Sequence, residues 1–148
     1  MTLSLLIQTA VAFIGTSTFS LIFNIPAREI LFCGVVGAAG WLVSGIIQIQ
    51  LPDGAVLGTF AGTLTLTGIS RALSFARKKP VLVYLIGGIL PLLPGAGLYH
   101  TMYDLIITND TYTALESGIR TAQLTGAIAL AIICVLSLPP ALFGLRKR

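Results

Sequence analysis

The fold is decided by the stretch from Tyr84 to Tyr103, which reads YLIGGILPLLPGAGLYHTMY. This stretch is apolar enough to enter a membrane, yet its middle holds two prolines, Pro91 and Pro94. Proline has no backbone N–H, so in a continuous helix these prolines would leave the carbonyls of Gly87 and Leu90 without a hydrogen-bond donor. The stretch therefore predicts a membrane helix that breaks at its prolines and resumes as a second half-helix.

The predicted break lies deep in the membrane, because about ten residues at 1.5 Å each separate Pro91 from the preceding basic segment. Non-helical backbone at that depth is stable only where protein or a water-filled cavity satisfies its polar groups. Transporters use such breaks to bind substrate: the N-terminus of a half-helix faces an anionic group, and freed carbonyls face a cation. An amino acid carries both charges, whereas a purely structural proline kink would bind neither.

In this chain, the half-helix that starts near Gly95 would bind a carboxylate, and the carbonyls of Gly87 and Leu90 would bind an ammonium group. Tyr99 would border the same cavity. The predicted substrate-binding residues are Gly87, Leu90, Pro91, Pro94, Gly95 and Tyr99.

Two ionisable residues, His100 and Asp104, follow the break one helical turn apart and therefore share a face. Ionisable groups inside a membrane are costly and mark functional sites, and a histidine beside a carboxylate exchanges protons near neutral pH. We predict that His100 and Asp104 couple transport to the proton gradient. The alternative is that Asp104 lies solvated at the outer interface or pairs with Arg120, and that His100 only contacts a neighbouring helix.

The whole chain has the composition of an integral membrane protein. Of its 148 residues, 55% are hydrophobic and only 9% are charged, against roughly 25% charged in a soluble domain. The net charge of +4 comes from short basic clusters between long uncharged stretches. That pattern indicates membrane topology and excludes an ordinary soluble or nucleic-acid-binding protein.

A membrane helix needs about 20 mostly apolar residues, and the chain is expected to form an all-α bundle of five such spans over residues 1–148. The expected spans are 3–23, 30–49, 55–70, 81–108 with its break, and 121–143. Basic residues cluster at 25–29, at 71–79 and at the C-terminus. Five crossings place all three clusters on one side, which the positive-inside rule makes the cytoplasm. The N-terminus is then outside, and the first span is retained rather than cleaved as a signal peptide.

Glycine and threonine recur on the second and third spans at helical spacing. Small residues at that spacing let helix backbones approach closely in lipid, and the threonine hydroxyls are expected to bond to carbonyls of their own helix. The alternative is that the threonine stripe lines a polar cavity. So many small-residue faces on a short chain also predict a higher oligomer. The positions are Gly34, Gly37, Gly40 and Gly45 in the second span, and Gly54, Gly58, Gly62, Thr59, Thr63 and Thr67 in the third.

Two motifs carry a resemblance to a known family: SFARKKP at 74–80 and GGILPLLPGAGLYHTMY at 87–103. Both resemble the threonine/serine exporter family, and in particular a short subunit that corresponds to the C-terminal membrane half of the full-length exporter. The family motif falls on Pro91, Pro94, Gly95 and Tyr99. The resemblance implies a multi-pass protein of the bacterial inner membrane that exports threonine and serine, or a dicarboxylate such as succinate, using the proton gradient.

The resemblance also implies a separately encoded companion subunit. Secondary transporters are commonly built from two related repeats around a central site, and this chain holds one broken segment and no visible repeat, as half a transporter would. The alternative is an accessory or scaffolding subunit without a substrate site of its own.

An enzyme is not expected, because the chain has no G-x-S-G nucleophile element, no paired aspartates and no H-E-x-x-H zinc motif. Cys33 and Cys134 lie in apolar stretches, where they are expected to act as small packing residues. We therefore expect no metal and no cofactor.

Overall fold

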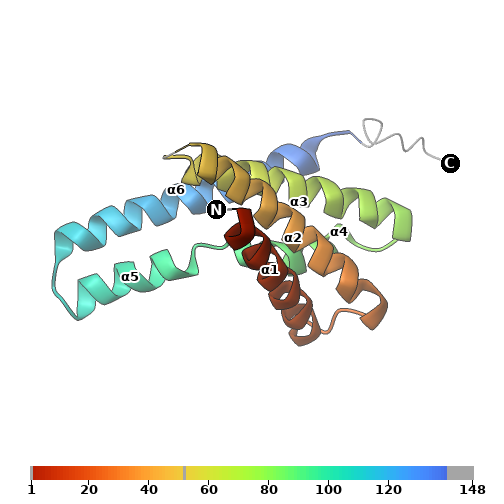
Figure 1. The fold of residues 1–148 in the computed structure, drawn as a ribbon, viewed down its shortest axis with the longest axis horizontal. Coiled ribbons are helices and arrows are strands. Elements are labelled where there is room, and N and C mark those ends of the chain that lie inside the picture. The colour runs from red at the N-terminus through yellow and green to blue at the C-terminus, as the bar shows by residue number, and fades with distance from the viewer. Residues whose placement is uncertain (1, 52, 140–148) are drawn as a thin grey trace.

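The computed structural model describes residues 2–51 and 53–139, and within these residues it is entirely helical (Figure 1). The expected all-α class is thereby confirmed. The helices are α1 (Thr2–Ile22), α2 (Ala27–Gln50), α3 (Ala55–Arg77), α4 (Val81–Ile89), the 3₁₀ turn η1 (Leu90–Leu92), α5 (Gly95–Ile106) and α6 (Thr111–Ser137).

The helices alternate in direction along the chain. α1, α3 and α6 run one way, whereas α2 and the α4–α5 segment run the other way (Figure 1). α2 lies at the centre and packs against α1, α3 and α4. Among the described helices, α5 makes extensive contact with α6 alone. These two helices form a hairpin that projects from the rest of the bundle (Figure 1).

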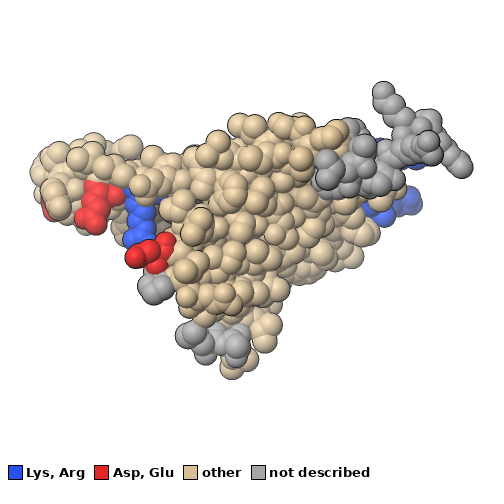
Figure 2. Space-filling model, turned by 90° about the horizontal axis from the view of Figure 1, so that it is seen from above, with Lys and Arg blue, Asp and Glu red and all other residues tan. Residues whose placement is uncertain are grey.

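Three helices are long and apolar enough to cross a membrane, namely α1 from Leu3, α2 and α6. The bent pair Val81–Leu92 and Gly95–Ile106 would make a fourth span. α3 is not among them, since four threonines and three glycines lower its hydropathy. Figure 2 shows a face that is uncharged across its centre, with acidic side chains toward one end and basic side chains toward both ends. The protein is therefore an all-helical membrane protein.

Helix packing follows the small residues, as the sequence predicts. A Cβ on Gly62 of α3 would lie 2.5 Å from the backbone oxygen of Gly40, and one on Gly58 would lie 2.8 Å from the backbone oxygen of Ser44. On another face of α2, Gly34 packs against the side chains of Ser17 and Phe13 from α1. These glycines are helix interfaces, since any side chain there would separate the backbones.

Two of the three threonine hydroxyls in the predicted stripe of α3, those of Thr63 and Thr67, bond within their own helix, which confirms the expectation at these two positions. Thr63 donates to the carbonyl of Thr59 at 2.7 Å, and Thr67 donates to the carbonyl of Thr63 at 2.7 Å. The threonine stripe therefore adds polarity to the sequence without exposing unpaired groups at these two positions.

The third and fifth spans do not have the predicted limits. The polar stretch before the fifth span is helical from Thr111, because Asp110 caps the helix by accepting hydrogen bonds from the backbone N–H groups of Tyr112 and Thr113. The predicted end of that span, residue 143, lies outside the described residues. α3 continues past Ser70 to Arg77, so the prediction that Arg71 lies in a loop is wrong.

Arg71 is buried because the backbone carbonyls at the C-terminal end of α6 stabilise its positive charge. Its side chain is 8% exposed, and the guanidinium donates hydrogen bonds to the carbonyls of Val135, Leu136 and Leu138. These carbonyls form the negative end of the helix dipole, which favours a cation. The contact fixes the C-terminal ends of α3 and α6 side by side.

Candidate functional site

The helix breaks where the prolines predict. α4 ends at Ile89, η1 covers residues 90–92, and α5 starts at Gly95 after an extended Leu93, with a bend of 52° between the two halves. The carbonyl of Leu90, predicted to be freed, is instead an acceptor for the Leu93 N–H at 3.3 Å. The prediction for this carbonyl is wrong because the chain tightens into a 3₁₀ turn, whose bonds span three residues rather than four.

The second half-helix presents free backbone donors at its start. The Gly95 N–H donates to the carbonyl of Leu93 at 2.8 Å and the Leu98 N–H donates to the carbonyl of Pro94 at 3.2 Å. The N–H groups of Ala96 and Gly97, which lie between them, make no hydrogen bond to the described residues. Such groups form the positive end of the helix dipole and favour an anion.

A groove of about 480 Å³ runs between α5 and α6 beside these donors, and we call it the hairpin groove. The groove brings together residues predicted to bind substrate, residues predicted to couple protons, and three polar residues of α6. The lining includes Pro94, Gly97, His100 and Asp104 from α5, and Ser117, Arg120 and Thr121 from α6.

Opposite charges share the hairpin groove without pairing. Among the described residues the structure records one ion pair, between Glu29 and Arg77, so Asp104 and Arg120 are more than 4.0 Å apart. The alternative in which Asp104 pairs with Arg120 is therefore not observed. A carboxylate and a guanidinium held apart in one groove match the two charges of a free amino acid.

A second groove, of about 440 Å³, lies on the other side of the break, and we call it the break groove. Leu90 and Pro91 form one wall, and α1 and Trp41 of α2 form the rest. Two buried polar atoms of its lining residues, Thr16 Oγ1 and Trp41 Nε1, have no hydrogen-bond partner in the described part of the chain. The predicted residues are thus divided between two grooves, with Leu90 and Pro91 in one and Pro94, His100 and Asp104 in the other.

Three predicted residues lie outside both linings. Gly87 is buried where α4 crosses α1 and α2, and a Cβ there would lie 2.8 Å from Ser20 Oγ. Gly95 has open space around its Cα, with nothing within 4 Å of an added Cβ. Tyr99 is 63% exposed and stacks on Tyr103 with ring centroids 6.0 Å apart.

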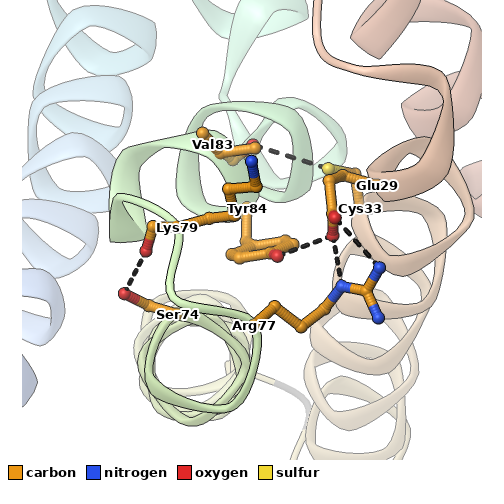
Figure 3. Close-up of polar contacts among 7 residues, drawn as sticks. All are labelled: Glu29, Cys33, Ser74, Arg77, Lys79, Val83 and Tyr84. Atoms are coloured by element: carbon orange, nitrogen blue, oxygen red, sulfur yellow. Dashed lines mark hydrogen bonds and ion pairs between the residues drawn. The ribbon is translucent and has the colours of Figure 1, made fainter.

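A buried ion pair anchors the first half-helix (Figure 3). Glu29 of α2 is 4% exposed, and its carboxylate accepts hydrogen bonds from Arg77 Nε at 2.6 Å, Arg77 Nη2 at 3.0 Å and the Tyr84 hydroxyl at 2.7 Å. The Arg77 guanidinium also lies 4.3 Å from the ring centre of Phe32. The cluster joins α2, α3 and α4 at one end of the bundle.

The cluster was not predicted, although one feature of the sequence indicates it. Glu29 is the single acidic residue within the three basic segments of the chain. A carboxylate surrounded by basic residues is a candidate partner for one of them. Which of the basic residues it pairs with depends on how α2 and α3 pack, and so comes from the structure.

The chain is similar to known proteins over most of its length. A family model described as "Threonine/Serine exporter, ThrE" matches residues 8–138. A curated protein of Haemophilus influenzae, named "Uncharacterized protein", is 26% identical over 149 residues, which cover 98% of this chain and 50% of the relative. The chain thus spans about half the length of this curated relative. No solved structure matches the chain.

Proposed function

The chain belongs to the threonine/serine exporter family, and from this premise we propose that it is a subunit of a secondary transporter. The exported solute is a small amino acid such as threonine or serine, or a small dicarboxylate such as succinate. The observation that carries the proposal is the broken segment, in which a half-helix N-terminus faces a groove that also holds His100, Asp104 and Arg120.

The charges of the hairpin groove suit a zwitterion. The substrate carboxylate would bind the free N–H groups of Ala96 and Gly97 together with the guanidinium of Arg120. The substrate ammonium group would bind the Asp104 carboxylate. One carboxylate of a dicarboxylate would bind the same donors. Its second carboxylate would meet Asp104, so Asp104 would have to be protonated to avoid repulsion between like charges. The charge of Asp104 would therefore select between the two classes of substrate.

Proton coupling is assigned to His100 and Asp104. The two side chains line one groove and lie one turn apart on α5. A proton on either group changes the charge that the substrate meets, so proton and substrate binding are linked. This linkage is what a proton-driven exporter requires.

A companion subunit would complete the site. The chain spans half of its curated relative, and α5 has no buried residue, so none of the described residues covers its outer face. Five large side chains of this face are each more than 40% exposed, namely Leu98, Tyr99, Met102, Tyr103 and Ile106. We propose that a second membrane half packs against this face and that the pair assembles further into a higher oligomer.

We further propose five crossings with the N-terminus outside the bacterial inner membrane. The alternation of helix directions supports five crossings if α3 is counted with the four apolar spans. The Glu29–Arg77 ion pair and the Arg71 contacts bring the start of α2, the last turns of α3 and the end of α6 together. The first two of these segments carry basic clusters, and the third cluster follows α6 at residues 146–148, outside the described residues. By the positive-inside rule the end of the bundle where these segments meet is cytoplasmic.

The second candidate function is a scaffolding subunit, which the exposed face of α5 would also suit. Efflux separates the two. Cells loaded with a threonine-containing dipeptide are compared when they express this chain, the companion, both chains, or both with Gly95→Leu. An added Cβ at Gly95 meets open space within the described chain, so the variant chain is expected to fold, and the amount of companion that co-purifies with it reports assembly.

For a transport subunit, threonine leaves the cell only with both wild-type chains, and the Gly95→Leu complex assembles but fails to export. Unchanged export by the Gly95→Leu complex would favour the scaffold. Succinate efflux is measured in the same four strains, so that the choice of substrate does not decide the result.

A further inference from the structure

A row of polar side chains on α1 and α2 leads away from the break groove. These residues line a third groove, of about 260 Å³, which we call the polar groove. Gln8 and Trp41 line both the polar groove and the break groove, so the two are neighbours along the α1–α2 face. The polar residues of the row are Ser4, Gln8, Ser44 and Gln48.

The row lies where a membrane helix ordinarily carries apolar side chains. Gln48 Nε2 donates to Ser44 Oγ at 2.8 Å, and Gln8 Nε2 lies 3.5 Å from Ser4 Oγ. Polar groups in contact with lipid are costly, so in membrane proteins they face a neighbouring helix or a water-filled cavity. The row extends toward the end of the bundle where α1 begins and α2 ends, as the contact between Gly45 and Leu5 shows.

Two buried hydrogen-bond donors, Thr16 Oγ1 and Trp41 Nε1, lie at the end of this row that adjoins the break groove. Thr9, Ser17, Thr18 and Ser20 of α1 each donate to a carbonyl four residues earlier. Thr16 is 1% exposed, and its hydroxyl has no such bond to the described residues. Trp41 Nε1 is likewise buried without an acceptor in the described part of the chain.

Both donors belong to residues that line the break groove, opposite Leu90 and Pro91, and the Thr16 hydroxyl lies at the edge of that groove, against Gly37 of α2. Buried polar groups in native proteins are almost always hydrogen-bonded, so a pair without partners at one groove indicates an absent acceptor. The remaining lining is apolar and includes Ile7, Val11 and Ala12. This combination fits a short aliphatic solute that carries a hydrogen-bond acceptor such as a carboxylate.

We propose that the break groove is a second binding position for the transported carboxylate, in which Thr16 and Trp41 donate hydrogen bonds to it. The polar groove is then the route from this position to the membrane face at which α1 begins. The inference rests on the proposed transport function and adds a route on the far side of the break from His100 and Asp104.

The first test removes the donors one at a time in the complex with the companion. Thr16→Val replaces the hydroxyl by a methyl group, and Trp41→Phe removes the N–H and retains an aromatic ring. Thr18→Val is the matched control, because the Thr18 hydroxyl is exposed and bonds to the carbonyl of Ile14. We expect the initial efflux rate to fall about tenfold or more in each donor variant, as for a lost hydrogen bond to a charged group, and to stay unchanged in Thr18→Val.

A second measurement follows occupancy directly. A cysteine at Gln8 is labelled from outside with a membrane-impermeant maleimide in a background with Cys134→Ser, and external threonine or succinate is added as a competitor. Solute should slow labelling at Gln8→Cys but not at Leu3→Cys, which lies in the first turn of α1, is 69% exposed and lines neither groove. The amount of companion that co-purifies with each variant reports assembly.

The outcomes separate the inference from the function on which it rests. If the wild-type complex exports solute, both donor variants export at the wild-type rate and solute does not slow labelling at Gln8→Cys, the route is overturned and the transport function stands. If the wild-type complex exports neither threonine, serine nor succinate, the transport function is overturned and the route with it.

Discussion

The hydroxyl of Tyr84 donates a 2.7 Å hydrogen bond to Glu29, so the first turn of α2 holds the first turns of α4 in place. Arg77 completes the cluster from the last turn of α3. α5, beyond the break, has no buried residue. The two halves of the broken segment are therefore unequal: α4 is anchored by the cluster, whereas α5 packs, among the described helices, against α6 alone.

The Tyr84 hydrogen bond is expected to stabilise the bundle measurably. Tyr84→Phe leaves the ring in place and removes one donor from a buried carboxylate, which costs about 1.5–3 kcal/mol. The free energy of unfolding is measured by SDS titration in mixed micelles. Tyr112→Phe, at a position that is 79% exposed, is the control and should change nothing. Equal stability of Tyr84→Phe and the wild type would show that the hydrogen bond does not anchor α4.

Arg71 is expected to be needed for the docking of α6. Arg71→Met keeps an apolar stem of similar reach and leaves the carbonyls at the end of α6 without this donor. Arg71→Lys keeps the charge but loses the planar fork that reaches several carbonyls at once. Limited proteolysis near residue 138 should be fastest in Arg71→Met, intermediate in Arg71→Lys and slowest in the wild type. Equal rates in all three proteins would contradict the assigned contact.

Two glycines of α3 provide a matched pair of substitutions. A Cβ at Gly62 would lie 2.5 Å from the Gly40 backbone oxygen, whereas one at Gly68 would have nothing within 4 Å. Gly62→Ala should therefore destabilise the protein by about 1–3 kcal/mol through overpacking. Gly68→Ala should be neutral or stabilise by up to about 1 kcal/mol, because alanine favours the helix. The same SDS titration measures both, and a reversed order would argue against the α2–α3 interface.

The start of α6 should depend on pH through Asp110. The hydrogen bond from the Thr113 hydroxyl, followed by those from the N–H groups of Thr113 and Tyr112, lowers the pKa of the Asp110 carboxyl. Because the folded pKa lies below the unfolded one, the stabilisation is complete above the unfolded value and is lost as the pH falls through the folded value. Hydrogen exchange at residues 111–114 should show less protection, relative to the rest of α6, at pH 3 than at pH 6.

Asp110→Asn is the control for that measurement. Asparagine caps helices about as well as aspartate and does not titrate in this range. The loss of relative protection at pH 3 should therefore be absent in the variant. The same loss in both proteins would place the pH effect elsewhere in the chain.

The sequence predicted the features that depend on local chemistry. Pro91 and Pro94 break the helix because a proline ring acts on its own turn, wherever it lies in the fold. The close packing at Gly58 and Gly62 also follows from spacing within one helix. The Leu90 carbonyl was predicted to lack a hydrogen bond because the prediction assumed an ideal α-helix. The segment instead forms a 3₁₀ turn, in which this carbonyl accepts a hydrogen bond from the Leu93 N–H.

The features that the sequence did not predict join residues far apart in the chain. Glu29 lies 48 residues from Arg77 and 55 from Tyr84, and Arg71 lies 64 residues from Val135. In the Arg71 contacts the acceptors are backbone carbonyls, which leave no mark in the amino-acid sequence. The division of the predicted site between two grooves likewise depends on the 52° bend and on where α1 packs.

The central claim is that the broken segment of this chain, together with a companion, moves a small carboxylate across the membrane. The most direct test is uptake of labelled threonine or succinate into proteoliposomes that contain the purified complex, with an imposed pH gradient and either wild-type, Gly95→Ala or Gly95→Leu chains. The account predicts uptake that depends on the pH gradient in the wild type, near-wild-type uptake with Gly95→Ala, whose added Cβ meets open space, and none with Gly95→Leu, whose longer side chain would occupy that space beside the free N–H groups of Ala96 and Gly97. Uptake that is the same in all three complexes, or absent from the wild type for every solute, would contradict it.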